Sequence, residues 1–187
     1  MTGPAPTFAT EVTALWGGRG SGKTTLAREL IGRAELRRVV IIDPVAPVGW
    51  ASAAEVIQAL EAGSPRVVLR SSTRAVILQT LYAAFLHSSP ARPVYAVCDE
   101  APAYLDKSTE GLAKLMFQGR HRAFGMMILG QRPTAVDAGI RSQAAVTYWL
   151  RLSDHRDQQI AAQALGPDRA RELASFKPGQ FIRHPPK

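Results

Sequence analysis

A glycine-rich segment close to the N-terminus has the residue types and the spacing of a phosphate-binding loop. Residues 17–24 read Gly-Gly-Arg-Gly-Ser-Gly-Lys-Thr and match the pattern G-x-x-x-x-G-K-[ST] at every fixed position. In such a loop Lys23 reaches the β- and γ-phosphates, and the Thr24 hydroxyl ligates Mg²⁺. Successive backbone N–H groups surround the phosphate oxygens at the start of a helix. We expect a nucleoside triphosphate with Mg²⁺, most simply ATP, to be held by Gly17, Gly18, Arg19, Gly20, Ser21, Gly22, Lys23, Thr24 and Thr25.

Two adjacent acids, Asp99 and Glu100, follow the apolar run 94–98. An acid at the carboxyl end of a strand can hold the magnesium shell, and a neighbouring glutamate can orient and deprotonate an attacking water. Taken alone, the pattern also fits a strand that ends in two solvated acids. The loop upstream favours the catalytic interpretation, with Asp99 as a metal ligand and Glu100 as the general base.

The segments between these motifs alternate between β-branched runs and helical spacing. This alternation predicts an α/β fold, in which a mostly parallel central sheet is flanked by helices. We expect strands at 12–16, 38–43, 66–70, 94–98, 126–129, 146–152 and 179–183, and helices at 24–31, 52–62, 73–86, 109–121 and 154–165.

Length and composition limit the organisation of the chain. The 187 residues suffice for one domain with one sizeable core, and we expect residues 1–10 and 184–187 to be flexible or peripheral. The single cysteine, Cys98, lies in an apolar run and is predicted to be a buried structural thiol. The formal charge of +8 favours polyanionic partners, although an ordinary soluble surface can also be basic. The sequence has no run of eighteen apolar residues and no signal-like N-terminus, so we expect a soluble protein that is not secreted.

Residues 122–133, Arg-Ala-Phe-Gly-Met-Met-Ile-Leu-Gly-Gln-Arg-Pro, carry a family resemblance. They resemble the segment of the FtsK/HerA superfamily of DNA-pumping ATPases that reads R-x-x-G, an apolar strand and T-Q-R-P. Residues 138–143, 151–153, 157–166 and 177–181 are similar to elements that follow in that family. The resemblance implies the additional-strand, catalytic-glutamate (RecA-like) class of P-loop NTPase. In that class the strand that ends at Gln131 lies between the phosphate-loop strand and the Asp99 strand.

The resemblance also implies further site residues. Gln131 would face the γ-phosphate, where a neutral amide can donate to a phosphate oxygen and accept from the lytic water; a hydrogen-bonded strand terminus is the alternative. Arg122 matches the family arginine associated with a finger that enters the neighbouring subunit's site, and Arg120 competes for that role. A guanidinium suits developing phosphoryl charge. Either arginine could instead be a solvated helix-end charge or a contact to the DNA backbone.

The domains that accompany larger family members are not recognisable in this sequence, and the chain resembles the small genome-packaging ATPases of membrane-containing icosahedral viruses. The resemblance implies a pentameric or hexameric ring that drives double-stranded DNA into a capsid through a vertex or portal protein. It places the protein in the host cytoplasm or the virion. Lys107, Lys114 and Arg19 are candidate contacts to DNA, although solvated surface charges would explain these residues equally well.

Three alternatives remain open. One is a phage morphogenesis or export ATPase of the same superfamily, and another is an ATP-binding switch without catalysis. The third is a small-molecule kinase with an arginine-rich lid, which would leave Glu100 and Gln131 without a role. Its lid would come from Arg151, Arg156, Arg169 and Arg171. A base-reading motif such as N-K-x-D does not occur, so the preference for ATP over GTP rests on the resemblance alone.

Overall fold

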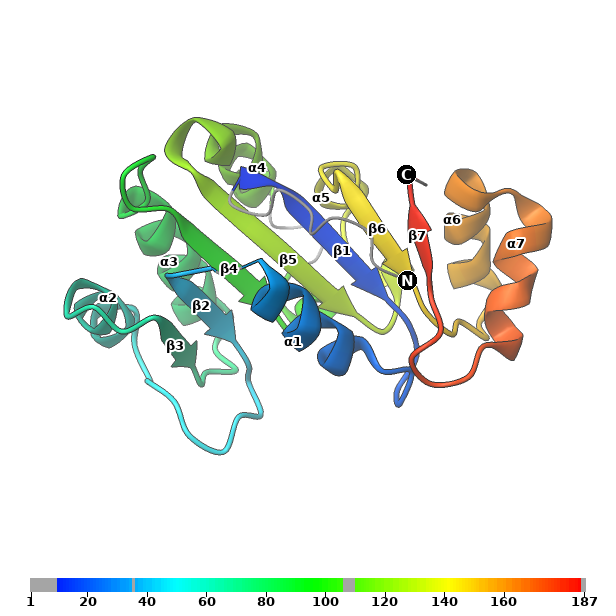
Figure 1. The fold of residues 1–187 in the computed structure, drawn as a ribbon, viewed down its shortest axis with the longest axis horizontal. Coiled ribbons are helices and arrows are strands. Elements are labelled where there is room, and N and C mark those ends of the chain that lie inside the picture. The colour runs from blue at the N-terminus through cyan, green and yellow to red at the C-terminus, as the bar shows by residue number, and fades with distance from the viewer. Residues whose placement is uncertain (1–9, 35, 106–109, 186–187) are drawn as a thin grey trace.

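Seven strands form one sheet in the computed structural model, which describes residues 10–34, 36–105 and 110–185 (Figure 1). The strands are β1 (Val12–Trp16), β2 (Val39–Ile42), β3 (Arg66–Leu69), β4 (Val94–Cys98), β5 (Phe124–Gly130), β6 (Val146–Trp149) and β7 (Ile182–His184). Their order across the sheet is β3-β2-β4-β5-β1-β6-β7, and every neighbouring pair is parallel except β6 and β7. The predicted α/β class with a mostly parallel sheet is confirmed.

The central position of β5 decides where the functional segments meet. β5 pairs with β1 on one side and with β4 on the other, in the order predicted for an additional-strand NTPase. Parallel strands present their carboxyl ends at the same edge of a sheet. The segments that follow β1, β5 and β4 therefore converge at that edge.

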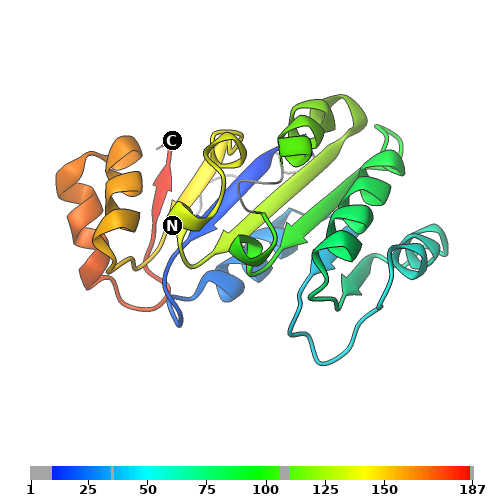
Figure 2. The same cartoon turned by 180° about the vertical axis from the view of Figure 1, so that it is seen from behind.

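Helices cover both faces of the sheet (Figures 1 and 2). They are α1 (Lys23–Arg33), α2 (Ala53–Glu61), α3 (Arg74–Leu86), α4 (Glu110–Arg122), α5 (Ala138–Arg141), α6 (His155–Leu165) and α7 (Pro167–Glu172). α1 lies on one face, whereas α3, α4 and α5 lie on the other. α6 and α7 pack on each other at the β7 end of the sheet. None of the helices within the described ranges is long and apolar enough to cross a membrane.

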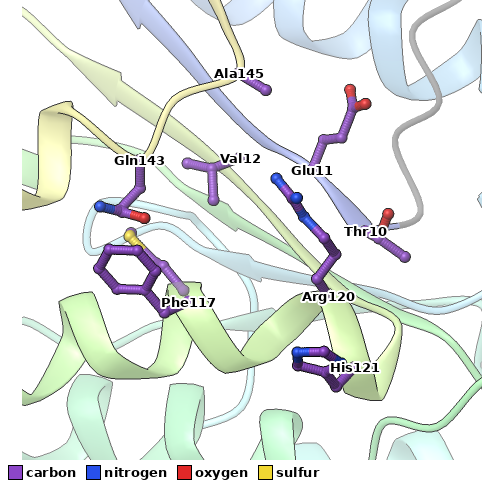
Figure 3. Close-up of a pocket in the computed structure, with 9 residues that line it drawn as sticks. Thr10, Glu11, Val12, Phe117, Arg120, His121, Gln143 and Ala145 are labelled. Atoms are coloured by element: carbon purple, nitrogen blue, oxygen red, sulfur yellow. The ribbon is translucent and has the colours of Figure 1, made fainter.

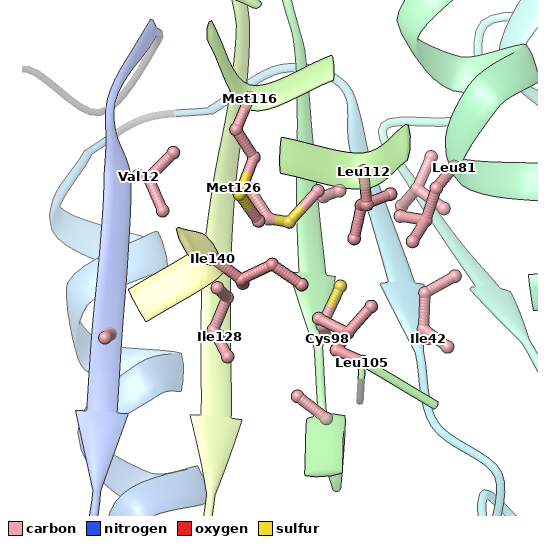
Figure 4. Packing of buried hydrophobic residues seen from close by; sticks show 14 of the residues in the cluster. Val12, Ile42, Leu81, Cys98, Leu105, Leu112, Met116, Met126, Ile128 and Ile140 are labelled. Atoms are coloured by element: carbon pink, nitrogen blue, oxygen red, sulfur yellow. The ribbon is translucent and has the colours of Figure 1, made fainter. Parts of the chain in front are cut away.

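The core consists of two apolar layers, one on each face of the sheet. Along β5, Met127 and Leu129 pack on the α1 side, whereas Met126 and Ile128 pack on the opposite side (Figure 4). This alternation follows from the two-residue period of a strand. Burial on both faces explains why the central strands are continuously apolar in sequence. Cys98 is fully buried in the layer that lies opposite α1, with Met126 and Ile128. Burial raises the pKa of its thiol to about 12, so the predicted buried structural thiol is confirmed.

Several predicted boundaries differ from the structure. The strand predicted at 126–129 begins earlier because Phe124 and Gly125 pair with β4. The strand predicted at 146–152 ends at Trp149, and the one predicted at 179–183 spans Ile182–His184. Two short helices, α5 and α7, were not predicted; α7 begins with Pro167, whose fixed φ suits the first helical turn.

The predicted chain ends and two candidate DNA contacts are only partly described. Residues 1–9, 186–187, Lys107 and the side chain of Lys114 lie outside the described residues. Residue His184, which we expected to be flexible or peripheral, is the last residue of the edge strand β7.

Candidate active site

The phosphate loop connects β1 to α1, as predicted. Gly20 and Gly22 have φ values of 70° and 97°, a left-handed region that glycine adopts without steric cost. Lys23 begins α1 and turns back over the loop, where its Nζ donates to the carbonyls of Gly17 at 2.7 Å and Gly18 at 3.2 Å. Burial lowers the pKa of Lys23, while Glu100 and Asp99 act in the opposite direction. These two hydrogen bonds hold the lysine at the loop.

Two segments from the far end of the chain brace this loop. After β6, the carbonyl of Arg151 accepts a hydrogen bond from Gly18 N at 2.7 Å, and its guanidinium donates to the carbonyl of Arg19 at 3.2 Å. Before β7, Gly179 N donates to the carbonyl of Ser21 at 2.9 Å. A Cβ on Gly22 would lie 2.9 Å from Gly179 N, so these backbones approach too closely for a side chain. The sequence suggested Arg151 only as part of a kinase lid and gave the Gly179 segment no role in the site, because this proximity depends on the position of β6 beside β1.

Asp99 and Glu100 lie together at the carboxyl end of β4. Burial raises the pKa of the half-buried Asp99; the backbone N–H of Glu100 and the charge of Lys23 lower it, and the charges of Asp43 and Glu100 raise it. Glu100 has φ 50° and ψ 37°, a left-handed conformation that is uncommon for a residue with a side chain. Such strain persists where the surroundings impose it, and it is frequent at functional sites. Asp43, which follows β2, was missed, although an acid at a neighbouring strand end was the available signal.

Gln131 contacts the predicted general base directly. Its Nε2 donates to Glu100 Oε1 at 2.9 Å and to Oε2 at 3.2 Å. The structure therefore brings the phosphate loop, the two acids and Gln131 to one edge of the sheet, where sequence reasoning expected them to meet.

The residues that follow Gln131 are anchored to the start of α6. Arg132 forms ion pairs with Asp154 and Asp157, each at 3.4 Å. Thr134 donates to Asp157 Oδ1 through its hydroxyl at 2.7 Å and its backbone N–H at 3.2 Å. The side chain of Asp157 is only 2% exposed. Sequence reasoning did not identify this network, because its partners are separated by more than twenty residues.

Thr24 and Asp99 fit the magnesium site predicted for them. Thr24 lies exposed in the first turn of α1, and the negative charges of Asp43 and Glu100 act on Asp99, so a cation bound to Asp99 would relieve that repulsion. No cluster of three acids, histidines or cysteines able to enclose a metal occurs among the residues that the structure describes. Mg²⁺ commonly uses one or two protein ligands and completes its shell with phosphates and water, which agrees with this sparse donor set.

Arg120 and Arg122 lie at the opposite edge of the sheet from the phosphate loop, the two acids and Gln131. Both precede β5, whose seven residues span roughly 20 Å at about 3.3 Å per residue. Arg122 donates to the carbonyl of Leu86 at 2.8 Å, and its guanidinium lies 5.2 Å from the ring centre of Phe85. Arg120 extends toward β1 and lines a cavity of about 290 Å³ (Figure 3). Across that distance neither arginine acts on its own subunit's site, so a role in catalysis requires a neighbouring copy.

The arginines of the alternative kinase lid are spread over the segment after β6, α6 and α7, with Arg156 exposed in the first turn of α6. Arg151 contacts the phosphate loop, but Arg169 and Arg171 lie exposed on α7, which packs on α6 at the β7 end of the sheet. Arg171 is paired with Asp168 of the same helix. This arrangement argues against a lid.

Comparison with known proteins agrees with this geometry. No family model matches the chain. Over 98 residues, 48% of this chain, it is 30% identical to the DNA double-strand break repair helicase HerA of Saccharolobus solfataricus, and the match spans 20% of that protein. The matched half of this chain thus corresponds to about a fifth of that relative.

Solved structures resemble the chain over nearly its whole length. The DNA-packaging ATPase B204 from Sulfolobus turreted icosahedral virus has a TM-score of 0.74 at 14% identity, with 94% of this chain and 92% of that chain covered. The genome-packaging NTPase of Sulfolobus turreted icosahedral virus 2, in complex with ATP-gammaS, has a TM-score of 0.75 at 16% identity, with the same coverage. The N-terminal domain of zonular occludens toxin from Neisseria meningitidis has a TM-score of 0.51 at 15% identity, with 94% and 93% covered. The chain has the fold of the packaging ATPases and resembles P-loop ATPases of the FtsK/HerA type.

Proposed function

We propose that this protein hydrolyses ATP and, as an oligomeric ring, drives double-stranded DNA into a viral capsid. The observation that carries the proposal is the convergence of Lys23, Asp99, Glu100 and Gln131 at one edge of the sheet, with Gln131 bonded to Glu100. The packaging NTPases that share the fold support it, since one of them was solved with ATP-gammaS. The helicase relative supports DNA as the load. A capsid vertex or portal partner, and a location in the host cytoplasm or virion, follow from the same proposal.

Binding of ATP would reorganise the hydrogen bonds of Lys23. The Nζ now donates to two loop carbonyls, and the β- and γ-phosphate oxygens are stronger, charged acceptors. The loop N–H groups and the start of α1 would complete the phosphate site. Magnesium held through Thr24 and Asp99 would neutralise phosphate charge when bound.

Glu100 and Gln131 would control the attack of water. A carboxylate can take the proton of the lytic water, but both oxygens of Glu100 now accept from the Gln131 amide. A γ-phosphate would offer the Gln131 amide a competing acceptor. If the amide donated to that phosphate instead, Glu100 would be free to act as the base. Hydrolysis would then be linked to the presence of the γ-phosphate.

The network that follows Gln131 gives this change a route to the rest of the molecule. Arg132 and Thr134 bind Asp157, so a displacement of Gln131 would pull on the start of α6. The DNA would be bound through its phosphates, because electrostatic contact to the DNA backbone does not depend on base sequence. A chain with a formal charge of +8 suits that contact.

An arginine from a neighbouring subunit would complete the site. Arg120 is the better placed of the two, because Arg122 is tied to Leu86 and Phe85, whereas no hydrogen bond or ion pair holds Arg120 in the described part of the chain. Contact between unlike edges of identical subunits is a head-to-tail interface, which closes into a ring when the rotation permits.

Steady-state ATP hydrolysis with and without long duplex DNA tests the proposal. We expect duplex DNA to stimulate the wild type. Glu100→Gln should retain ATP binding but lose hydrolysis by on the order of 10²-fold or more, and Lys23→Ala should lose both. Phosphate transfer to a small acceptor without stimulation by DNA would favour the kinase. Stimulation by single-stranded but not duplex DNA would favour the export ATPase.

A further inference from the structure

The segment that precedes β7 lies directly against the phosphate loop, and its role is not explained by phosphate binding. Figure 1 shows this segment, in red, running beside the loop that follows β1, in blue. Gly179 N donates to the carbonyl of Ser21, and the backbones of Gly179 and Gly22 are in close contact. Phe181 follows two residues later, so its Cα lies within about 7 Å of that of Gly179.

The ring of Phe181 lies on the same face of the sheet as α1. It packs edge-on against Tyr148, with ring centres 5.4 Å apart. Tyr148 is buried in the apolar layer that also contains Leu26 and Leu30 of α1, which fixes the face. Phe181 nevertheless remains 43% exposed. An aromatic ring with a free surface therefore lies on the face of the sheet that α1 covers.

The strand order determines the direction in which a bound nucleotide points. Asp99, Glu100 and Gln131 follow β4 and β5, which lie on one side of β1; β6 and β7 lie on the other. The γ-phosphate must face the catalytic residues, so the α-phosphate and the nucleoside must leave toward β6 and β7. That direction leads from the loop to the segment that carries Phe181.

We infer that Phe181 forms the base site of the nucleotide, with its exposed ring stacked on a purine. The inference rests on the proposed nucleotide-binding function and adds the group that recognises the nucleoside. Stacking depends on the area of the π-face and tolerates different bases. Phe181 therefore favours the larger purines only modestly over pyrimidines and does not separate adenine from guanine, in agreement with the lack of a base-reading motif.

Binding of two probes to the nucleotide-free protein tests the inference: Mg·ADP, which has a base, and magnesium tripolyphosphate, which has none. We expect Phe181→Ala and Phe181→Leu to weaken the binding of Mg·ADP by about 5- to 150-fold, the range of one lost base–aromatic stack. Tripolyphosphate should bind as it does to the wild type. Phe181→Leu keeps apolar bulk against Tyr148, and Phe181→Trp should retain full affinity for ADP. Tyr82→Ala is the matched control, because Tyr82 is also an exposed aromatic residue, 53% exposed, on α3.

The outcomes separate the base site from the proposed function. Unchanged ADP affinity in both variants would overturn the inference, and so would an equal loss for both probes, because Phe181 would then only brace the loop. If Lys23→Ala bound both probes as tightly as the wild type, the assignment of the phosphate loop as the nucleotide site would be wrong, and with it the proposed function. Photolabelling with 8-azido-ADP gives a direct readout, and the label is expected in the tryptic peptide 172–183, which contains Phe181.

Discussion

At the scale of single residues, Asp99 would need its negative charge to hold magnesium, whereas its burial disfavours that charge. Burial raises its pKa in the folded protein. When the pKa of a carboxyl is higher in the folded than in the unfolded protein, its protonated form stabilises the folded state. This contribution is fully present below the unfolded pKa and is lost as the pH rises through the folded pKa. Asp99→Asn should therefore unfold at a higher temperature than the wild type at neutral pH, while magnesium-dependent hydrolysis is lost. The difference in melting temperature should shrink toward about pH 4, near the ordinary pKa of aspartate. A variant less stable than the wild type at neutral pH would contradict this assignment.

Gln131 offers a sharper test of the site, because within the described part of the chain its amide donates hydrogen bonds only to Glu100, the predicted general base. Removing a preorganised donor from a reaction site slows the chemical step by on the order of 10²-fold. We expect Gln131→Ala to lower kcat to about this extent while the affinity for Mg·ATP is kept. Measurements of kcat and KM, beside direct binding of a non-hydrolysable analogue, separate the two effects. A change in binding alone would make Gln131 a simple strand terminus.

At the scale of elements, the junction between the Gln131 segment and α6 depends on one buried carboxylate. Asp157 accepts two hydrogen bonds from Thr134 and an ion pair from Arg132. Asp157→Ala leaves the two half-buried donors of Thr134 without their acceptor, and we expect the free energy of unfolding to fall by about 1–2 kcal/mol. Urea denaturation measures this. Asp168→Ala is the control, since its pair with Arg171 is exposed and surface pairs contribute little. Equal stability of the two variants would show that the junction is not a structural anchor.

The elements also show what sequence could and could not predict. The glycine spacing of residues 17–24 and the acids after β4 were sufficient to place Lys23, Asp99 and Glu100, because these motifs encode local geometry. The position of β5 came from a family resemblance, since strand order is not written in the pattern of any single strand. Contacts such as Gly179 to Ser21 depend on that order and were missed. The helix after Gly166 was missed because Pro167 was not considered as a helix start.

At the scale of the whole molecule, the separation of its two functional edges makes a prediction about subunit mixing. The phosphate loop lies at the carboxyl edge and the candidate arginines at the amino edge, so in the proposed ring each site would need two subunits to be complete. Lys23→Ala keeps the arginine but loses the site, whereas Arg120→Ala keeps the site but loses the arginine. Each variant alone should be inactive. In a random equal mixture about one interface in four joins an intact site to an intact arginine, as a head-to-tail ring requires. ATP hydrolysis should therefore recover to roughly that fraction of the wild type.

The control for this experiment substitutes Arg122→Ala for Arg120→Ala, since the Arg122 guanidinium is occupied by Leu86 and Phe85. Recovery with Arg122→Ala but not with Arg120→Ala would reassign the finger to Arg122. Activity in neither mixture above the sum of its separate components would mean that each subunit hydrolyses ATP with its own residues. In that case the distance across β5 leaves Arg151, which already contacts the phosphate loop, as the cation to test next.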